Sequence, residues 1–169
     1  LFQSHVSIGA QMLPFAGWEM PIQYSGILAE AKAVRFAAGI FDVSHMGRVE
    51  ITGRDAAKFI DRLVTGDVLK MVVGRARYTI ICNEAGGIID DTIVYRLDEE
   101  RFLMVPNASN ADEVLAWLNH WKDTWGSQIE LNVITEETAL IALQGPLAKE
   151  ILQPICSVDM SDVRPFRCV

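Results

Sequence analysis

The sequence has few cysteines, no long apolar run and no stretch of basic residues. Its three cysteines, Cys82, Cys156 and Cys168, lack the spacing of metal ligands or of a disulfide framework. Free thiols are typical of a reducing compartment, which is therefore expected here. No apolar run approaches the length of a membrane span, about 18 to 20 residues, and the N-terminal segment does not resemble a signal peptide. We therefore expect no membrane association.

The charge balance is acidic. Lysine and arginine together number 15 against 22 aspartates and glutamates, which gives a formal net charge of −7. Without a basic cluster, nucleic-acid binding is disfavoured, although a local pocket can still bind a small anion. Half of the residues are hydrophobic, which is enough for a core and excludes a disordered chain. The length fits one ordinary domain or two small interlocked ones.

Hydrophobic spacing predicts alternating helices and strands after an irregular segment of 25 residues. The helices are expected at 26–38, 55–64, 111–122 and directly after Gly145-Pro146, and the strands at 40–44, 48–52, 78–83, 88–97, 101–106, 129–135 and 139–144. Asn110 and Glu113 resemble a capping box at the start of the third helix. Helices interspersed with antiparallel hairpins indicate an α+β fold with helices on one face of the sheets.

The hairpin around residues 84–87 carries the candidate chemistry. Side chains alternate along a strand, so Ile89, Asp91, Ile93 and Tyr95 share one face, and Ile88, Asp90, Thr92 and Val94 share the other. A loop of two or four residues places Tyr78 on the face of Asp91, whereas three or five residues place it opposite. A carboxylate among apolar and aromatic neighbours needs a donor, which a ligand N–H can supply. The alternative is that both aspartates border a turn and are solvated.

The other motifs do not indicate a catalytic or metal-binding site. Gly86-Gly87 lacks the pattern of a phosphate-binding loop and is expected to form a turn. Ser44 and His45 do not form a nucleophile–base pair, because neighbours on an extended chain face opposite ways. His5 and His120 are expected to be isolated. The acidic residues do not converge in one loop, so no metal site is predicted.

Four stretches together resemble one family, the T-protein of the glycine cleavage system, a tetrahydrofolate-dependent aminomethyltransferase. They are Pro14-Phe15-Ala16-Gly17-Trp18-Glu19-Met20-Pro21, Phe41-Asp42-Val43-Ser44-His45-Met46-Gly47, Asn83-Glu84-Ala85-Gly86-Gly87-Ile88-Ile89-Asp90-Asp91 and Ala142-Leu143-Gln144-Gly145-Pro146. Their order and separations also match, so the resemblance covers essentially the whole chain.

The resemblance implies transfer of a one-carbon unit from the aminomethyl-lipoyl arm of H-protein to tetrahydrofolate, with release of ammonia and no metal. It identifies Asp91 as the essential acidic residue, in contact with the folate near N10. Tyr78, Tyr95, Met46 and Asn107 are implied to line the folate pocket together with Asp91. Because the other face carries Asp90, near-wild-type activity of Asp90→Ala beside a loss of activity in Asp91→Ala would support this assignment.

The resemblance also implies two interleaved lobes, residues 1–47 with 136–169 and residues 48–135, the second with ferredoxin-like βαββαβ character. The family's further folate contacts and its C-terminal barrel are not among these 169 residues, so the chain alone is expected to bind folate poorly. Two alternatives share the fold. One is a non-catalytic folate-binding relative of the kind involved in iron–sulfur cluster maintenance. The other is the folate domain of a demethylating dehydrogenase.

Overall fold

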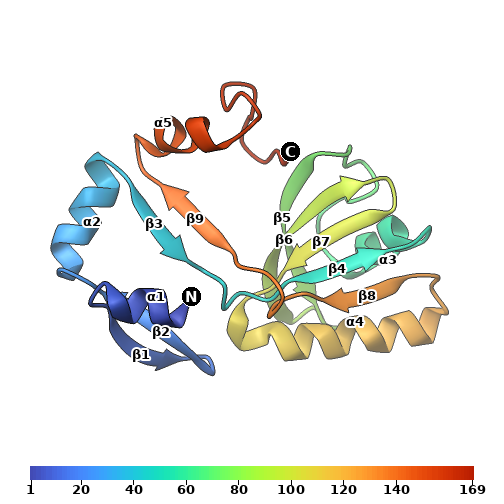
Figure 1. The fold of residues 1–169 in the computed structure, drawn as a ribbon. Coiled ribbons are helices and arrows are strands. Elements are labelled where there is room, and N and C mark those ends of the chain that lie inside the picture. The colour runs from blue at the N-terminus through green and yellow to red at the C-terminus, as the bar shows by residue number, and fades with distance from the viewer. The chain divides into compact units, whose positions relative to one another are not determined.

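A computed structural model describes residues 1–169 (Figure 1). The chain forms two compact units. The N-terminal unit comprises Leu1–His45 and Ala139–Asp162, and the sheet unit comprises Met46–Thr138 and Val163–Val169. No helix is long and apolar enough to cross a membrane.

The sheet unit contains a five-stranded sheet in the order β5-β6-β7-β4-β8. All neighbouring strands are antiparallel. The strands are β4 (Val49–Thr52), β5 (Arg75–Cys82), β6 (Ile88–Asp98), β7 (Arg101–Val105) and β8 (Glu130–Val133). Helix α3 (Ala56–Leu63) follows β4, and α4 (Ala111–Trp125) precedes β8 after a short 3-10 turn, η1 (Ala108–Asn110). Strands β8, β4, β7 and β6 keep the ferredoxin-like order, to which β5 adds an edge strand, so the predicted fold class is confirmed.

One face of this sheet is covered by both helices (Figure 1). Its core consists of alternate strand residues and one stripe of each helix, including Ile51, Ile81, Val94, Phe102, Phe59, Ile60, Val114 and Leu118. Trp117 and Trp121 pack against it half-buried, as the helical spacing predicts. Burying one large side chain stabilises the fold by about 1.5–3 kcal/mol. Because the period of a strand is two, this core fixes which residues face away from the helices.

The N-terminal unit contains two small antiparallel sheets. Helix α1 (Phe2–Ser7) precedes the hairpin of β1 (Gln11–Phe15) and β2 (Trp18–Gln23). Helix α2 (Ile27–Phe36) leads into β3 (Gly39–Asp42), which pairs with β9 (Ile141–Gln144). The unit ends with α5 (Ala148–Leu152) and a 3-10 turn, η2 (Gln153–Ile155).

Three local predictions were wrong. The first 25 residues are not irregular, because Ala16 and Gly17 both adopt positive φ and form a two-residue hairpin turn. The Asn110–Glu113 capping box does not form, since the Asn110 side chain binds elsewhere. The last short helix begins at Ala148 rather than at Pro146.

The final segment also differs from the expected lobe limits. Val163–Val169 groups with the sheet unit rather than with residues 139–162. The backbone N–H of Ala76 donates to the carbonyl of Phe166 at 2.9 Å, and that of Cys168 donates to the carbonyl of Gly74 at 2.9 Å. The segment therefore pairs with the beginning of β5, where an edge strand has unsatisfied backbone groups.

Candidate functional site

The face of the sheet opposite the helices brings the candidate residues together. Tyr78 pairs with Ile93, and Ile80 pairs with Asp91. Of the two placements that the loop length allowed, the structure therefore has the one with Tyr78 on the same face as Asp91. The burial pattern agrees, because Asp90, Thr92 and Val94 are buried while Asp91 is exposed. The pairing register of β5 and β6 shifts between Ile81 and Cys82, next to the turn that joins the two strands.

A direct hydrogen bond joins two of these side chains. The hydroxyl of Tyr78 donates to Oδ2 of Asp91 at 2.6 Å. This hydrogen bond, with desolvation and the charges of Asp91 and Asp90, raises the pKa of Tyr78. A raised pKa keeps the phenol protonated, so Tyr78 remains a donor to the carboxylate throughout the neutral range.

Asn107 completes the group from the end of β7. The Asn107 Nδ2 donates to the backbone carbonyl of Asp91 at 2.9 Å and to its Oδ1 at 3.2 Å. This placement follows from the register, because Ile93 pairs with Val105 and a continuation by two residues sets Asp91 across from Asn107.

Met46 lies three residues before the start of β4, the strand that neighbours β7. The backbone N–H of Gly47 donates to the carbonyl of Pro106 at 2.9 Å, which extends the β4–β7 pairing beyond Val49 and Met104. In that register Met46 lies across from Asn107. A Cβ on Gly47 would lie 2.7 Å from Cγ of Pro106, so the Pro106 ring packs against this position because residue 47 is glycine.

Tyr95 shares the face of Asp91 but lies farther along β6. Four residues of strand separate the two, which corresponds to about 13 Å. Tyr95 pairs with Ala76 on one side and Leu103 on the other, and it is half-buried. Burial raises the pKa of Tyr95, with a smaller contribution from Cys168. The structure thus joins Tyr78, Asp91 and Asn107 by hydrogen bonds and leaves Tyr95 outside that cluster.

A pocket of about 320 Å³ lies at the edge strand and includes Tyr78 in its wall. Its lining also contains Lys70, Arg75 and Arg77, together with Phe166 from the final segment. Lys70 is already bound to Asp67 at 2.5 Å. Arg75 and Arg77 alternate with Tyr78 along β5 and share the face of buried Thr79 and Ile81, so they lie on the opposite side of the strand from Asp91.

Asp90 is buried and accepts hydrogen bonds from two asparagines. It is only 2% exposed, and its Oδ2 accepts a 2.8 Å hydrogen bond from the backbone N–H of Asn107. Its Oδ1 accepts from Nδ2 of Asn107 at 2.9 Å and from Nδ2 of Asn110 at 2.7 Å. The reading of two solvated aspartates was therefore wrong for Asp90, since a buried carboxyl group needs these donors.

The exposed Asp91 carboxylate has the chemistry of an acceptor for a ligand N–H. A carboxylate offers about four lone-pair sites, and Tyr78 and Asn107 occupy one on each oxygen. Ile80 and Ile93 lie beside Asp91 on the same face of the sheet. This arrangement can bind an amine-bearing ring system and can stabilise positive charge that develops on its nitrogen.

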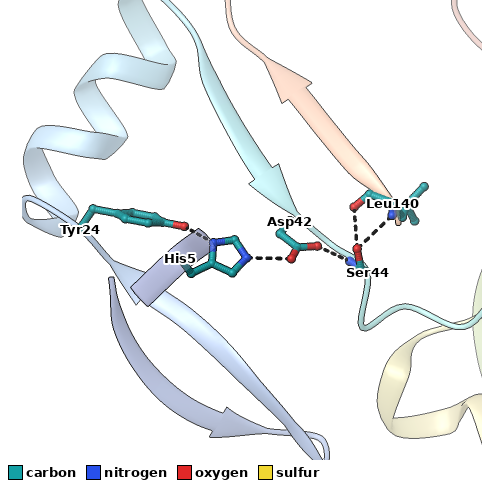
Figure 2. A network of polar contacts seen from close by, with 5 residues as sticks. All are labelled: His5, Tyr24, Asp42, Ser44 and Leu140. Carbon is teal, nitrogen blue, oxygen red and sulfur yellow. Dashed lines mark hydrogen bonds and ion pairs between the residues drawn. The ribbon is translucent and has the colours of Figure 1, made fainter. Parts of the chain in front are cut away.

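A second polar network lies within the N-terminal unit (Figure 2). Nε2 of His5 lies 2.8 Å from Oδ2 of Asp42, and Nδ1 of His5 lies 2.9 Å from the hydroxyl of Tyr24. The backbone N–H of Ser44 donates to Oδ1 of Asp42, and the hydroxyl of Ser44 accepts from the backbone N–H of Leu140. The expectation that His5 is isolated was therefore wrong.

This network connects helix α1, strand β3 and the neighbourhood of β9. The side chains of His5 and Asp42 are only 13% and 14% exposed. Burial acts to raise the pKa of Asp42, but hydrogen bonds from Ser44 and His5 lower it below its ordinary value. Burial and the nearby carboxylates Asp42 and Glu30 raise the pKa of Tyr24, so the phenol is not activated as a nucleophile. The network holds the unit together rather than forming a reactive centre.

Asn110 and the role of Asp90 were missed by the motif analysis. The signal was nevertheless present, because the alternation of β6 already placed Asp90 on the same face as Thr92 and Val94. A carboxyl group on a buried face requires nearby donors, and Asn107 and Asn110 follow the neighbouring strand. The contact of His5 with Asp42 joins residues 37 positions apart and had no local signal.

Comparisons with known proteins agree on one family. The model of the GCVT N-terminal domain matches residues 1–168. An aminomethyltransferase from Symbiobacterium thermophilum is 46% identical over 168 residues, and one from Bacillus subtilis is 43% identical over 166; both alignments cover 98% of this chain. The crystal structure of glycine cleavage system aminomethyltransferase T from Bartonella henselae is 34% identical and matches 98% of this chain with a TM-score of 0.90.

The chain spans about half the length of these relatives. It covers 45% of each of the two aminomethyltransferase sequences and 45% of the crystallised protein.

Proposed function

Because the chain belongs to the family of the GCVT N-terminal domain, we propose that this protein acts as an aminomethyltransferase of glycine cleavage. The substrates are the aminomethyl-lipoyl arm of H-protein and tetrahydrofolate. The products are ammonia, dihydrolipoyl H-protein and 5,10-methylenetetrahydrofolate. This assignment places the protein in glycine catabolism and one-carbon metabolism. We propose the bacterial cytoplasm or the mitochondrial matrix as its compartment.

One observation carries the proposal. The carboxylate of Asp91 is exposed on an open sheet face while Tyr78 and Asn107 hold both of its oxygens. Two fixed partners hold such a carboxylate in one orientation and leave some of its lone pairs free to accept further hydrogen bonds. This suits recognition of a secondary amine. The flat apolar surface of Ile80 and Ile93 beside it suits an aromatic ring.

Each residue has a defined role in the proposed reaction. Tetrahydrofolate, when bound, supplies the amine that accepts the one-carbon unit. Asp91 accepts a hydrogen bond from that amine and stabilises positive charge as it develops there. Tyr78 and Asn107 hold the Asp91 carboxylate in one orientation. Met46 and Tyr95 line the same face on either side, where they exclude water and help to position the ring.

No metal is required by these roles. The acid–base work is assigned to a carboxylate, and the remaining rate enhancement comes from holding two substrates in attack geometry. H-protein is the proposed macromolecular partner, since it carries the aminomethyl group.

The full-length gene product tests this proposal directly. Aminomethylated H-protein and tetrahydrofolate are supplied, and ammonia and 5,10-methylenetetrahydrofolate are measured together. Equal amounts of both products support the assignment. Tetrahydrofolate binding without turnover would instead identify a non-catalytic folate-binding relative, and formation of neither product nor complex would reject both.

A further inference from the structure

The side-chain amide of Asn107 lies between the carboxyl groups of two consecutive aspartates. One lies on the buried face of β6 and the other on the open face. The Nδ2 of Asn107 is 2.9 Å from Oδ1 of Asp90, 2.9 Å from the carbonyl of Asp91 and 3.2 Å from Oδ1 of Asp91. A single amide group therefore connects the buried carboxyl group to the candidate catalytic one.

These contacts determine which way the amide faces. All three neighbours of Nδ2 are oxygen acceptors, so the nitrogen and not the oxygen of the amide must point toward them. The side-chain hydrogen bonds of Asn107 all use Nδ2, which leaves its amide oxygen Oδ1 available as an acceptor. Rotation of the amide by half a turn would set Oδ1 against the oxygens of Asp90 and Asp91, which is repulsive.

Asp90 holds the backbone in the same place. Its Oδ2 accepts from the backbone N–H of Asn107, and its Oδ1 accepts from the side-chain amide of the same residue. The Asp90 carboxyl group therefore binds both the backbone and the side chain of Asn107. Asn110 donates to Asp90 at 2.7 Å but makes no contact with Asp91. Asn107 and Asn110 thus both donate to the buried Asp90 carboxyl group. Only Asn107 also contacts Asp91 on the open face.

We propose that Asp90 is a positioning residue that acts through Asn107. It orients the Asn107 amide so that Nδ2 holds Asp91 and Oδ1 presents a second acceptor to an N–H group of the bound co-substrate. This inference rests on the proposed function, since it concerns the same site. It differs from a purely structural role because it predicts that the effect of Asp90 on binding disappears when the Asn107 amide is removed.

A double-mutant cycle in the full-length protein tests the inference. The variants are Asp90→Asn, Asn107→Ala and the double variant, with Asn110→Ala as the matched control. Asparagine keeps the shape of Asp90 but offers an N–H where only acceptors fit. The Kd of tetrahydrofolate, measured by titration calorimetry, and the melting temperature are recorded for each. Should Asp90→Asn not fold, Asp90→Ser, which keeps an acceptor oxygen, replaces it.

We expect Asp90→Asn to weaken tetrahydrofolate binding by about tenfold, the equivalent of one lost hydrogen bond to a charged group. In the Asn107→Ala background the same change should alter Kd by less than about twofold. Asn110→Ala should lower the melting temperature and leave Kd unchanged. Independent, multiplicative effects on Kd, or a weakened Kd in Asn110→Ala, would overturn the inference while leaving the proposed function standing. A wild-type protein that binds no tetrahydrofolate would overturn both.

Discussion

The hydroxyl of Tyr78 donates a 2.6 Å hydrogen bond to Oδ2 of Asp91 across two paired strands. Because Tyr78 is 55% exposed, this bond is made at a surface that a ligand can reach. Together with the Asn107 contact to Oδ1, the bond fixes the orientation of the Asp91 carboxylate. The residues that it joins come from strands β5 and β6, whose pairing is the most extensive in the sheet unit.

The first prediction concerns this hydrogen bond. Tyr78→Phe should lower kcat for methylenetetrahydrofolate formation by about tenfold, since the carboxylate loses one of its two fixed partners. The melting temperature should change little, because the ring remains and the hydroxyl is exposed. Tyr24→Phe is the matched control, since it removes a phenol hydroxyl that binds His5 and should leave kcat near wild type. Full activity of Tyr78→Phe would show that the bond does not position Asp91.

The second prediction uses the close approach at Gly47. Gly47→Ala forces a methyl group within 2.7 Å of Pro106, next to Asn107, and should cost about 1–3 kcal/mol of folding free energy. Displacement of Asn107 should also weaken tetrahydrofolate binding, measured as Kd.

Gly126→Ala provides its control. Gly126 ends helix α4 at φ 58° with open space around it, so alanine there should cost about 1 kcal/mol through the backbone alone. We expect its tetrahydrofolate Kd to equal that of wild type. If both glycine variants lose affinity equally, the loss reflects general destabilisation and not the geometry at Asn107.

The fold was largely predictable because its signals are local. Alternation along β6 and helical spacing in α4 identify the two faces that meet in the core. The same alternation, with the loop length, places Tyr78 and Asp91 on one face. The N-terminal hairpin was not predictable in this way, because Pro14 and Pro21 disfavour strands and Ala16-Gly17 is an uncommon pair for its turn.

The contacts within the site depended on tertiary structure. The register of β6 with β7 sets Asn107 across from Asp91, and no feature of the sequence near Asn107 specifies that register. The resemblance to a known family supplied Asn107 as a candidate, and the structure supplies its partners. Asp90 is the opposite case, since its burial was implied by alternation but its donors come from the segment after β7.

The third prediction concerns the core of the sheet unit. Leu118 is fully buried on the inner face of α4, so Leu118→Ala should lower the free energy of unfolding by about 2–5 kcal/mol. Ala116→Ser, at an exposed position of the same helix, should change it by less than about 0.5 kcal/mol. Chemical denaturation of the full-length variants measures both values. Similar losses from the two substitutions would contradict the assigned packing of α4.

The fourth prediction concerns acid stability of the N-terminal unit. Hydrogen bonds from Ser44 and His5 lower the pKa of Asp42 despite its burial. A lowered pKa in the folded state contributes stability above the unfolded value, about 3.9, and that contribution is lost as pH falls through the folded value. Asp42→Asn should therefore be less stable than wild type above about pH 5, and the difference should shrink below about pH 4.

Thermal unfolding of wild type and Asp42→Asn between pH 3 and pH 7 measures this difference. Asp112→Asn, at an exposed position of α4, is expected to show no such dependence. A stability difference for Asp42→Asn that grows on acidification would contradict the stated direction of the pKa shift.

The most direct test of the account is the turnover of Asp91→Asn in the full-length protein with aminomethylated H-protein and tetrahydrofolate. Asparagine preserves the shape and one acceptor oxygen while removing the charge, so kcat should fall by at least about 100-fold with little change in melting temperature. Glu84→Gln, in the exposed turn of the same hairpin, should retain wild-type kcat. An Asp91→Asn enzyme with wild-type turnover would contradict the central claim that the Asp91 carboxylate drives the transfer.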